Sequence, residues 1–216
     1  MLYDAIVLGG GRSSRLSGTP KAGLVYRGET LLGRTVAATA GARSVVVVGE
    51  LPARVTLPGH PLVTREFPPF GGPAAAISAG VAMLSALAST PGSQPSEFTL
   101  VLACDMPDIH RAVPLLLEAA PGHPDIDGVF AVDEDGRSQP LAALYRTSRL
   151  ERALTDRRRT GTLDGVSVRA LLENLRLEPV PVPPGSTHDV DTWADAVFYG
   201  IAGPPASAMG DRGTNS

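Results

Sequence analysis

The chain has 216 residues, of which 43% are apolar, and a formal net charge of −3 at neutral pH. This size and composition favour one globular α/β domain, and the mildly acidic balance argues against a nucleic-acid-binding surface or a membrane partner. A single cysteine, no apolar run long enough to span a membrane and no signal-peptide pattern among the first residues together predict a cytoplasmic protein without internal disulfides.

Short apolar or β-branched runs alternate with helical stretches along the chain. Continuous apolar runs are typical of buried parallel strands, and their alternation with helices predicts a mainly parallel sheet covered on both faces. The expected strands are residues 5–8, 44–48, 98–103, 128–132, 141–145 and 180–182. The expected helices are residues 31–41, 73–89, 113–120, 149–156, 169–175 and 193–199. A polar loop over 90–96 and a disordered tail over 203–216 leave one expected domain, residues 1–202.

The first expected strand ends in a glycine turn, residues 9–11, followed by hydroxyl and cationic side chains. Glycine permits positive φ and close approach of the main chain, and the exposed N–H groups of such a turn bind anions. The side chains that could add to a phosphate site are Ser13, Ser14, Arg15 and Lys21. The spacing fits neither the P-loop nor the dinucleotide fingerprint, and it is also compatible with a plain tight turn followed by solvated cations.

Asp105 lies at the carboxyl end of the expected strand 98–103, after Cys104. In open α/β sheets the ligand crevice lies at the carboxyl ends of the strands, and a carboxylate there suits Mg²⁺. The pattern alone fits equally well with Asp105 as a helix N-cap, because Pro107 follows it closely. Its neighbour Cys104 is expected to be a small buried residue, since no histidine partner lies close in sequence.

The two blocks resemble a known family. The stretch VLGGGRSSRLSGTPK is similar to the L-A-G-G-x-S-S-R-M-G-x-D-K-A signature of the molybdenum cofactor guanylyltransferases, which belong to the nucleotide-diphospho-sugar transferase-like superfamily, and CDMP matches their C-D-x-P. The matching positions of the first block are Leu8, Gly10, Gly11, Ser13, Ser14, Arg15, Lys21 and Ala22. The sequence departs from the signature at Gly9, Leu16 and Ser17, and at Pro20, which replaces an aspartate and could alter how Lys21 is presented.

Three further segments resemble the same family in the expected order. In REFPPFGGPAAAI, Glu66 falls where the relatives carry an aspartate near the nucleoside, and Gly72 and Pro73 match the motif, although Ala76 replaces its last glycine. GRSQPLAALY puts Gln139 and Pro140 on the side of the pterin substrate. HDVDTWAD carries Asp189 and Asp191 where the relatives carry asparagines and Trp193 where they carry a proline, and the resemblance makes Asp191 a candidate second Mg²⁺ ligand.

Each of these segments also has a purely structural interpretation. Pro73 suits the first turn of a helix, Asp135-Gly136 is a hairpin turn signal, and Asp191 or Thr192 could cap the last helix. The run of arginines at 157–159 is expected to be an exposed helix end or loop.

The resemblance implies a single three-layer, Rossmann-like α/β domain and a nucleotidyltransferase that moves GMP from GTP to molybdopterin with Mg²⁺. It implies catalytic roles for Arg15, Lys21 and Asp105, metal ligation by Asp105 and Asp191, and possible partners among molybdenum-insertion proteins or molybdoenzyme chaperones. The implied nucleotide-binding residues are Leu8, Gly9, Gly10, Gly11, Ser13, Ser14, Arg15, Lys21, Glu66, Gly72 and Asp105.

Gly10 and Gly11 favour GTP, because the cytidylyl relatives carry Ala-Gly at these positions. The alternatives are a molybdopterin cytidylyltransferase, another small-molecule NTP transferase, or a degenerate nucleotide-binding regulator.

Overall fold

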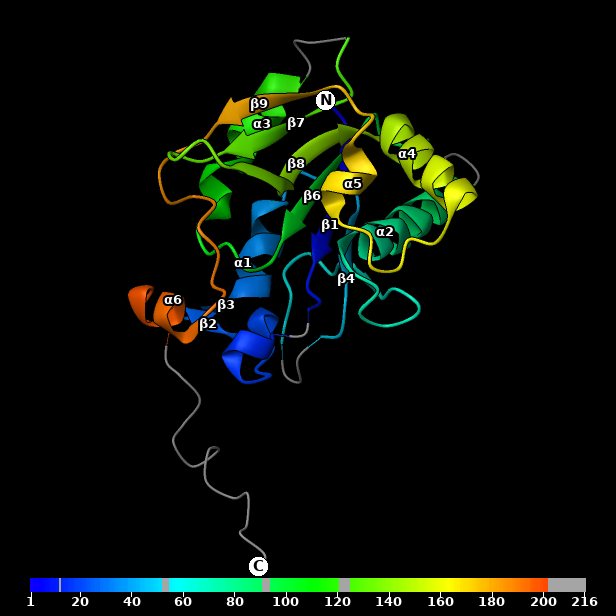
Figure 1. Ribbon diagram of the computed structural model, residues 1–216. Coiled ribbons are helices and arrows are strands. Elements are labelled where there is room, and N and C mark those ends of the chain that lie inside the picture. Colours follow the sequence, from blue (N-terminus) through cyan, green and yellow to red (C-terminus); the bar gives the residue numbers. More distant parts are fainter. Residues whose placement is uncertain (12, 52–54, 91–93, 121–124, 202–216) are drawn as a thin grey trace, which may run out of the picture.

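The computed structural model describes residues 1–11, 13–51, 55–90, 94–120 and 125–201. A central seven-stranded sheet has the order β5-β4-β1-β6-β8-β7-β9, and helices flank it (Figure 1). Its strands are β1 (Tyr3–Leu8), β4 (Val45–Val48), β5 (Leu62–Thr64), β6 (Phe98–Ala103), β7 (Gly128–Val132), β8 (Ser138–Arg146) and β9 (Leu177–Pro181). A separate two-stranded hairpin joins β2 (Val25–Tyr26) and β3 (Glu29–Thr30).

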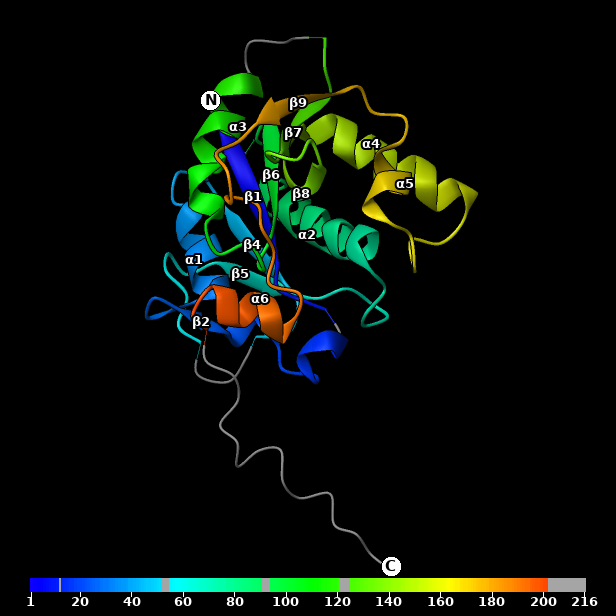
Figure 2. The same ribbon diagram turned by 60° about the vertical axis from the view of Figure 1, so that its left-hand side comes forward.

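The helices form the outer layers. They are α1 (Leu31–Ala38), α2 (Pro73–Ala88), α3 (Val113–Ala119), α4 (Thr147–Thr160), α5 (Val168–Leu172) and α6 (Trp193–Phe198), with short 3-10 helices η1 (Ser14–Leu16), η2 (Lys21–Gly23) and η3 (Ile109–Arg111). The apolar cluster on one face of the sheet contains Ile6 and Leu8 of β1 with residues of α2, α4 and α5. The opposite face buries Ala5 and Val7 against α1 and α3. Figure 2 shows the sheet between these two helical layers.

The sheet is mainly parallel, as the sequence predicts. The pairs β5–β4, β4–β1, β1–β6 and β7–β9 are parallel, and only β8 runs antiparallel to its neighbours β6 and β7. The carboxyl ends of β1, β4 and β6 therefore lie at one edge of the sheet, where the glycine turn and Asp105 follow. The three-layer α/β expectation is confirmed.

The predicted elements are found, with shifted ends. The hairpin turn between β7 and β8 is confirmed, since the Gly136 N–H donates to Asp133 O at 3.0 Å. Pro73 is the first residue of α2, and the arginines at 157–159 lie in the last turn of α4. Helix α4 is longer than predicted because its last turn is polar and lacks the apolar spacing that marks a helix.

Two features were not predicted. Strand β5 is a short edge strand whose Leu62 and Val63 are exposed, and this apolar pair is too short a run to predict a strand. The β2–β3 hairpin has only two residues in each strand, joined by Arg27 and Gly28 at positive φ. The predicted tail 203–216 lies outside the described residues.

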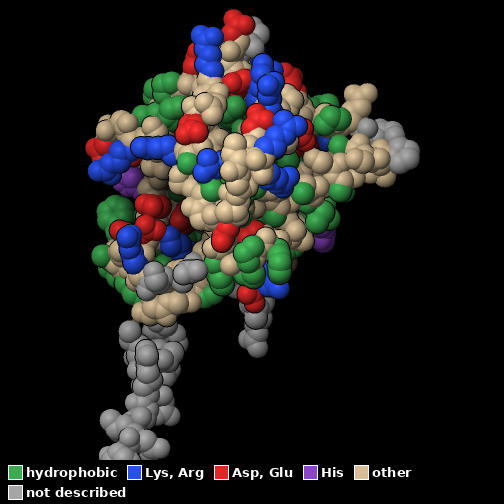
Figure 3. Space-filling model, turned by 45° about the vertical axis from the view of Figure 1, so that its right-hand side comes forward, with side chains coloured by type: hydrophobic (Ala, Val, Ile, Leu, Met, Phe, Trp, Pro, Cys, Tyr) green, Lys and Arg blue, Asp and Glu red, His purple; other side chains and the backbone are tan. Residues whose placement is uncertain are grey.

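Surface charge follows the composition. Basic and acidic side chains are interspersed on the face shown in Figure 3. Over the described ranges, no helix is long and apolar enough to cross a membrane.

Candidate active site

Main-chain contacts hold the carboxyl ends of β1, β4 and β5 together. The Gly9 N–H donates to Val48 O at 2.8 Å, and the Gly49 N–H donates to Thr64 O at 2.9 Å. Gly49 has φ +134°, and a Cβ atom there would lie 2.6 Å from the Gly10 nitrogen. Only glycine allows such an approach. The turn after β1 therefore packs directly on the turn after β4.

The 3-10 helices after the glycine turn present Lys21 to the sheet edge. Pro20 precedes η2, a position where its missing N–H leaves no helical hydrogen bond unmade. Ser13 Oγ accepts a hydrogen bond from the Lys21 main-chain N–H at 3.4 Å. With Pro20 in place, the Lys21 side chain still reaches Asp105.

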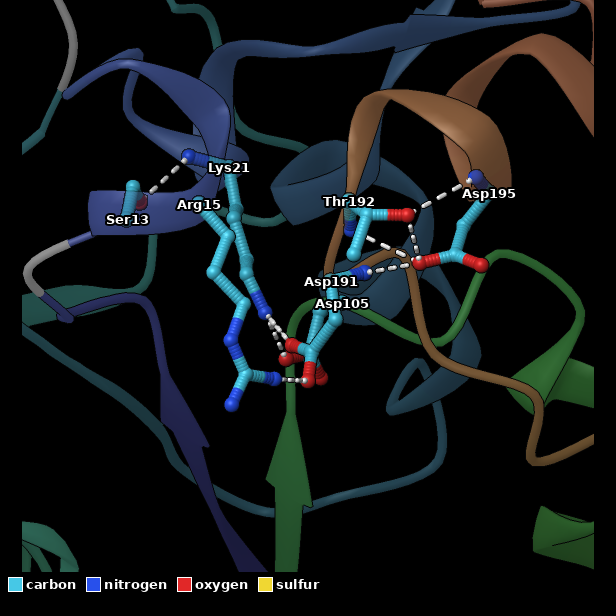
Figure 4. A network of polar contacts seen from close by, with 7 residues as sticks. All are labelled: Ser13, Arg15, Lys21, Asp105, Asp191, Thr192 and Asp195. Carbon is cyan, nitrogen blue, oxygen red and sulfur yellow. Dashed lines mark hydrogen bonds and ion pairs between the residues drawn. The ribbon is translucent and has the colours of Figure 1, made fainter.

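A charged cluster lies at this edge of the sheet. Lys21 Nζ donates to Asp105 Oδ2 at 2.9 Å and also to Asp191 Oδ1. Arg15 Nη1 lies 3.4 Å from Asp191 Oδ2. Figure 4 shows the two cations and the two carboxylates pointing toward one another. The structure thus brings together four residues that the sequence analysis singled out separately.

The environments of the two cations differ. The Lys21 side chain is 19% exposed, whereas that of Arg15 is 73% exposed. Burial alone would lower the pKa of Lys21, but the charges and hydrogen bonds of Asp105 and Asp191 outweigh it and raise the pKa. Lys21 is therefore a charged group at neutral pH inside the cluster, and Arg15 lies on its solvent-exposed side.

Asp105 does not cap a helix. The N-cap residue of η3 is Asp108, and the Asp105 carboxylate is bound to Lys21 instead. The capping interpretation of Asp105 is therefore wrong. The local reason is that three residues separate Asp105 from the first residue of η3, so the chain turns before a helix begins.

Asp189 joins the cluster, although the sequence analysis did not assign it a role. One carboxylate oxygen each from Asp105, Asp189 and Asp191 lie within 4.8 Å of one another. Desolvation raises the pKa of Asp189, and the like charges of Asp191 and Asp105 add to this effect. Side chains two residues apart in an extended segment point the same way, so the D-V-D spacing was the signal. Three hard oxygen donors this close fit a divalent cation such as Mg²⁺.

Packing and capping hold the segment that carries Asp191. The Val190 N–H donates to Asp105 O at 2.8 Å, and the Val190 side chain is fully buried. Asp195 Oδ2 accepts hydrogen bonds from the main-chain N–H groups of Asp191 at 3.1 Å and Thr192 at 2.7 Å. Thr192 Oγ1 accepts in return from the Asp195 N–H at 3.2 Å, which completes a capping box. Thr192, and not Asp191, is the N-cap of α6.

Two adjoining cavities open beside the cluster. The first cavity measures about 670 Å³ and is lined by Gly9, Gly10, Gly11, Ser13, Gly18, Pro20, Lys21, Gly49, Glu50, Leu51, Arg65, Glu66, Pro69 and Phe70. The second cavity measures about 530 Å³ and is lined by Leu8, Gly10, Gly11, Ser13, Arg15, Lys21, Glu66, Phe70, Gly72, Pro73, Ala76, Ala103, Cys104, Asp105, Leu141 and Asp191. They share the residues Gly10, Gly11, Ser13, Lys21, Glu66 and Phe70, so two ligands bound in them would meet beside Lys21.

Residues 5–179 match the model of the MobA-like NTP transferase domain. The chain belongs to this family. The family resemblance stated from the sequence motifs is thereby confirmed, and the chain is a nucleotidyltransferase.

Among curated proteins, a probable molybdenum cofactor guanylyltransferase of Clostridium perfringens is 28% identical over 146 residues. The alignment covers 67% of this chain and 66% of that protein. Among solved structures, the molybdopterin-guanine dinucleotide biosynthesis protein A of Archaeoglobus fulgidus superposes with a TM-score of 0.63 at 18% identity, covering 91% of this chain and 96% of that one.

A 2-C-methyl-D-erythritol 4-phosphate cytidylyltransferase of Francisella tularensis gives a TM-score of 0.69 at 12% identity, covering 93% of this chain and 99% of that one. At such identities the solved structures show a common fold.

In this MobA-like domain most of the expected nucleotide-binding positions line the two cavities. Gly9, Gly10, Gly11 and Ser13 line the first cavity, and Leu8 and Gly72 line the second. Glu66 lines both cavities, and its Oε1 accepts a hydrogen bond from the Phe70 N–H at 3.1 Å. Ser14 begins η1, but its side chain lies outside the described part of the structure.

The residues expected on the pterin side lie beside the second cavity and do not line it. Gln139 pairs with Ala131 of β7, and Pro140 O accepts a hydrogen bond from the Tyr145 hydroxyl at 2.7 Å. The next residue, Leu141, is the β8 residue that lines the cavity. The β7–β8 register shift between Phe130 and Ala131 falls at this place.

Cys104 is buried, as expected. Burial, and then the charge of Asp105, raise the pKa of its thiol to about 12. The thiol therefore stays protonated at neutral pH and is a poor nucleophile.

Proposed function

We propose that this chain transfers GMP from GTP to the phosphate of molybdopterin and releases pyrophosphate. The observation that carries the proposal is the pair of adjoining cavities with Lys21 between them. A transfer between two bound substrates needs both of them held with their reacting groups in contact. The similarity to a probable molybdenum cofactor guanylyltransferase supports the choice of substrates.

In this proposal the first cavity receives GTP. The turn at Gly10 and Gly11 approaches the triphosphate closely, and its N–H groups bind phosphate oxygens. Lys21, which lines both cavities, and Arg15, which lines the second and meets Lys21 at Asp191, neutralise the β- and γ-phosphates and the pyrophosphate that leaves. Ser13, which lines both cavities, adds a hydroxyl donor beside the same turn.

The second cavity receives molybdopterin in the proposal. Leu141 and Ala76 supply apolar contact to the pterin, while Gln139 and Pro140 border the cavity on β8. The acceptor phosphate then lies toward Lys21, where the two cavities meet.

Asp105 and Asp191 would hold Mg²⁺, with the Asp189 carboxylate close enough to join them. When bound, the ion would polarise the α-phosphate and neutralise charge that builds up during transfer.

The bond changes are simple. An oxygen of the molybdopterin phosphate bonds to the α-phosphorus of GTP, the bond from that phosphorus to the β-phosphate bridging oxygen breaks, and pyrophosphate leaves. The acceptor is an ionised phosphate monoester at neutral pH, so the reaction needs no strong general base. Positioning and charge neutralisation by Lys21, Arg15 and the glycine turn are what this chain supplies.

The choice of GTP rests on Gly10 and Gly11. Glycine at both positions lets the main chain come close to a large purine nucleotide. The proposed small-molecule partners are therefore GTP and molybdopterin, the proposed location is the cytoplasm, and the proposed catalytic unit is residues 1–202.

Pyrophosphate release tests the proposal. The purified protein is incubated with Mg²⁺, molybdopterin and, in parallel, GTP, CTP, ATP or UTP, and a known guanylyltransferase confirms that the molybdopterin is active. Release with GTP alone is expected. Release with CTP alone would overturn the choice of base. If no pyrophosphate is released with any of the four nucleotides, the catalytic proposal is overturned in favour of a nucleotide-binding regulator.

A further inference from the structure

The first cavity contains carboxylates, which are unexpected in a site that receives a triphosphate. Two carboxylates, Glu50 and Glu66, line it together with Arg65 and Lys21. A carboxylate close to a polyphosphate is destabilised by Coulomb repulsion unless it accepts hydrogen bonds from the same ligand. The donors of a nucleotide are its ribose hydroxyls and the N–H groups of its base. The carboxylates therefore belong at the nucleoside end of the cavity.

The main chain at Glu50 has a well-defined position. Gly49 before it packs on Gly10, and Leu51 after it packs against a buried cluster that contains Val7 and Leu32. The Glu50 residue itself is exposed to solvent in the free protein. Glu50 therefore lies two residues after the end of β4, between two packed neighbours, and lines the first cavity.

The two carboxylates differ in their hydrogen bonds. Glu66 Oε1 accepts a hydrogen bond from the Phe70 N–H at 3.1 Å. This bond holds the loop between Glu66 and Phe70. Within the described ranges, the structure shows no hydrogen bond or ion pair to the Glu50 carboxylate. Glu50 therefore has both oxygens available for a ligand.

Among the four bases only guanine offers two adjacent donors on one edge, at N1–H and the N2 amino group. A carboxylate accepts both of them in a bidentate pair. Cytosine and adenine place a ring nitrogen acceptor next to the amino donor, and uracil places a single N–H between two carbonyls, so each would set an acceptor against the carboxylate. Leu51 and Phe70 line the same cavity and can contact the faces of the base.

We propose that Glu50 determines the base specificity of this enzyme by accepting hydrogen bonds from N1–H and the N2 amino group of guanine. This inference rests on the proposed function and adds a direct contact with the base to the argument from Gly10 and Gly11.

Binding of nucleotides without molybdopterin tests the inference. Isothermal titration compares GTP, ITP and 2′-deoxy-GTP with the wild-type protein and with Glu50→Gln, because ITP lacks the N2 amino group and 2′-deoxy-GTP lacks a ribose hydroxyl. Glu66→Gln is the matched variant in the same cavity, and Glu173→Gln, at the C-cap of α5, is the surface control.

The wild type is expected to bind GTP about 10-fold more tightly than ITP, the effect of one hydrogen bond to a charged group. Glu50→Gln should remove most of that preference and weaken GTP binding by about 10- to 100-fold. Its ratio of GTP to 2′-deoxy-GTP affinity should stay at the wild-type value. Glu66→Gln should weaken GTP and ITP alike.

Two results would overturn the inference while the proposed function stands. One is a Glu50→Gln protein that keeps the wild-type preference for GTP over ITP. The other is a Glu50→Gln protein in which only the ratio of GTP to 2′-deoxy-GTP affinity changes. That result would show that Glu50 binds the ribose hydroxyl and not the base. A wild-type enzyme that releases pyrophosphate with CTP alone would instead overturn the proposed function, and this inference with it.

Discussion

The charged cluster is built from two regions that reach it by different means. Lys21 and Asp105 come from segments after β1 and β6, which are neighbouring parallel strands paired from Tyr3 to Leu8. Asp189 and Asp191 come from the segment between β9 and α6, which returns to the sheet edge from the far side of the molecule (Figure 1). The first pair is placed by sheet topology, because parallel strands end at the same edge.

The second pair is placed by a buried tertiary anchor and by the cap of α6. Val190, between the two aspartates, is buried in the same apolar cluster as Leu16, Leu24 and Tyr26. Its N–H donates to Asp105 O at 2.8 Å. The comparison shows that one site can combine a part set by strand topology with a part set by a buried anchor and a helix cap. Substitutions in the two regions should therefore have different consequences.

The largest effect is expected in the region after the strands. Asp105→Asn should lower the rate of pyrophosphate release by about 10³-fold or more, because it removes the carboxylate that pairs with Lys21 and would hold the metal. The free energy of unfolding should change by about 1 kcal/mol or less, since the Asp105 main-chain oxygen still accepts from Val190. Steady-state rates and urea unfolding measure the two effects. A rate within 10-fold of the wild type would show that the site lies elsewhere.

Substitutions of the two aspartates in the returning segment should have effects of different size. Asp191→Asn is expected to lower the rate by about 10²-fold and to raise the Mg²⁺ concentration needed for half-maximal rate, because Asp191 contacts both Lys21 and Arg15. Asp189→Asn should lower the rate of pyrophosphate release by about 10-fold, since Asp189 joins the cluster as its third carboxylate. Mg²⁺ titrations of the two variants measure this, and the reverse order would assign the main metal ligand to Asp189.

The contact between the two glycine turns can be broken at Gly49. Gly49→Ala should lower the free energy of unfolding by about 3 kcal/mol, because φ is +134° and the new Cβ would lie 2.6 Å from the Gly10 nitrogen. Gly136→Ala is the matched control, since φ is +76° there and no heavy atom lies within 4 Å of the new Cβ. The control should lose about 1 kcal/mol. Equal losses in denaturant titrations would show that the Gly10 contact contributes nothing.

The smallest effect concerns the cap of α6. Thr192→Ala should lower the free energy of unfolding by about 1 kcal/mol through loss of the capping box. It should also raise the Mg²⁺ requirement, because Thr192 and Asp195 hold the main chain at Asp191. Thr30→Ala removes the N-cap of α1 and should cost a similar free energy with no change in the Mg²⁺ requirement. If both variants alter the Mg²⁺ requirement equally, capping does not position Asp191.

The same contrast explains what the sequence could predict. The alternation of strands and helices is a local pattern, so the fold followed from it. The glycine turn and the acid after β6 made Lys21 and Asp105 candidates, and the family resemblance assigned them to the site. Asp191 entered only through the family resemblance, because nothing local shows that its segment returns to the sheet edge. Asp189 was missed although its D-V-D spacing with Asp191 was visible, because that spacing does not show that the segment lies beside Asp105. The proposed role of Glu50 likewise depends on its neighbours in space.

The other differences have physical causes as well. Strand β5 has only three residues, so the apolar pair Leu62 and Val63 is too short a run to predict a strand. Gln139 and Pro140 lie beside the second cavity rather than in it, because the β7–β8 register shift changes which residues of β8 face the site. A register shift leaves no mark in the hydrophobic pattern of a strand.

Mass spectrometry of the pterin product tests the central claim most directly. The wild-type protein is incubated with GTP, Mg²⁺ and molybdopterin, and a known guanylyltransferase acts on the same molybdopterin as a control. The account predicts a pterin that has gained one GMP group, with pyrophosphate formed in equal amount. Unchanged molybdopterin, in a preparation that the control enzyme converts, would contradict it.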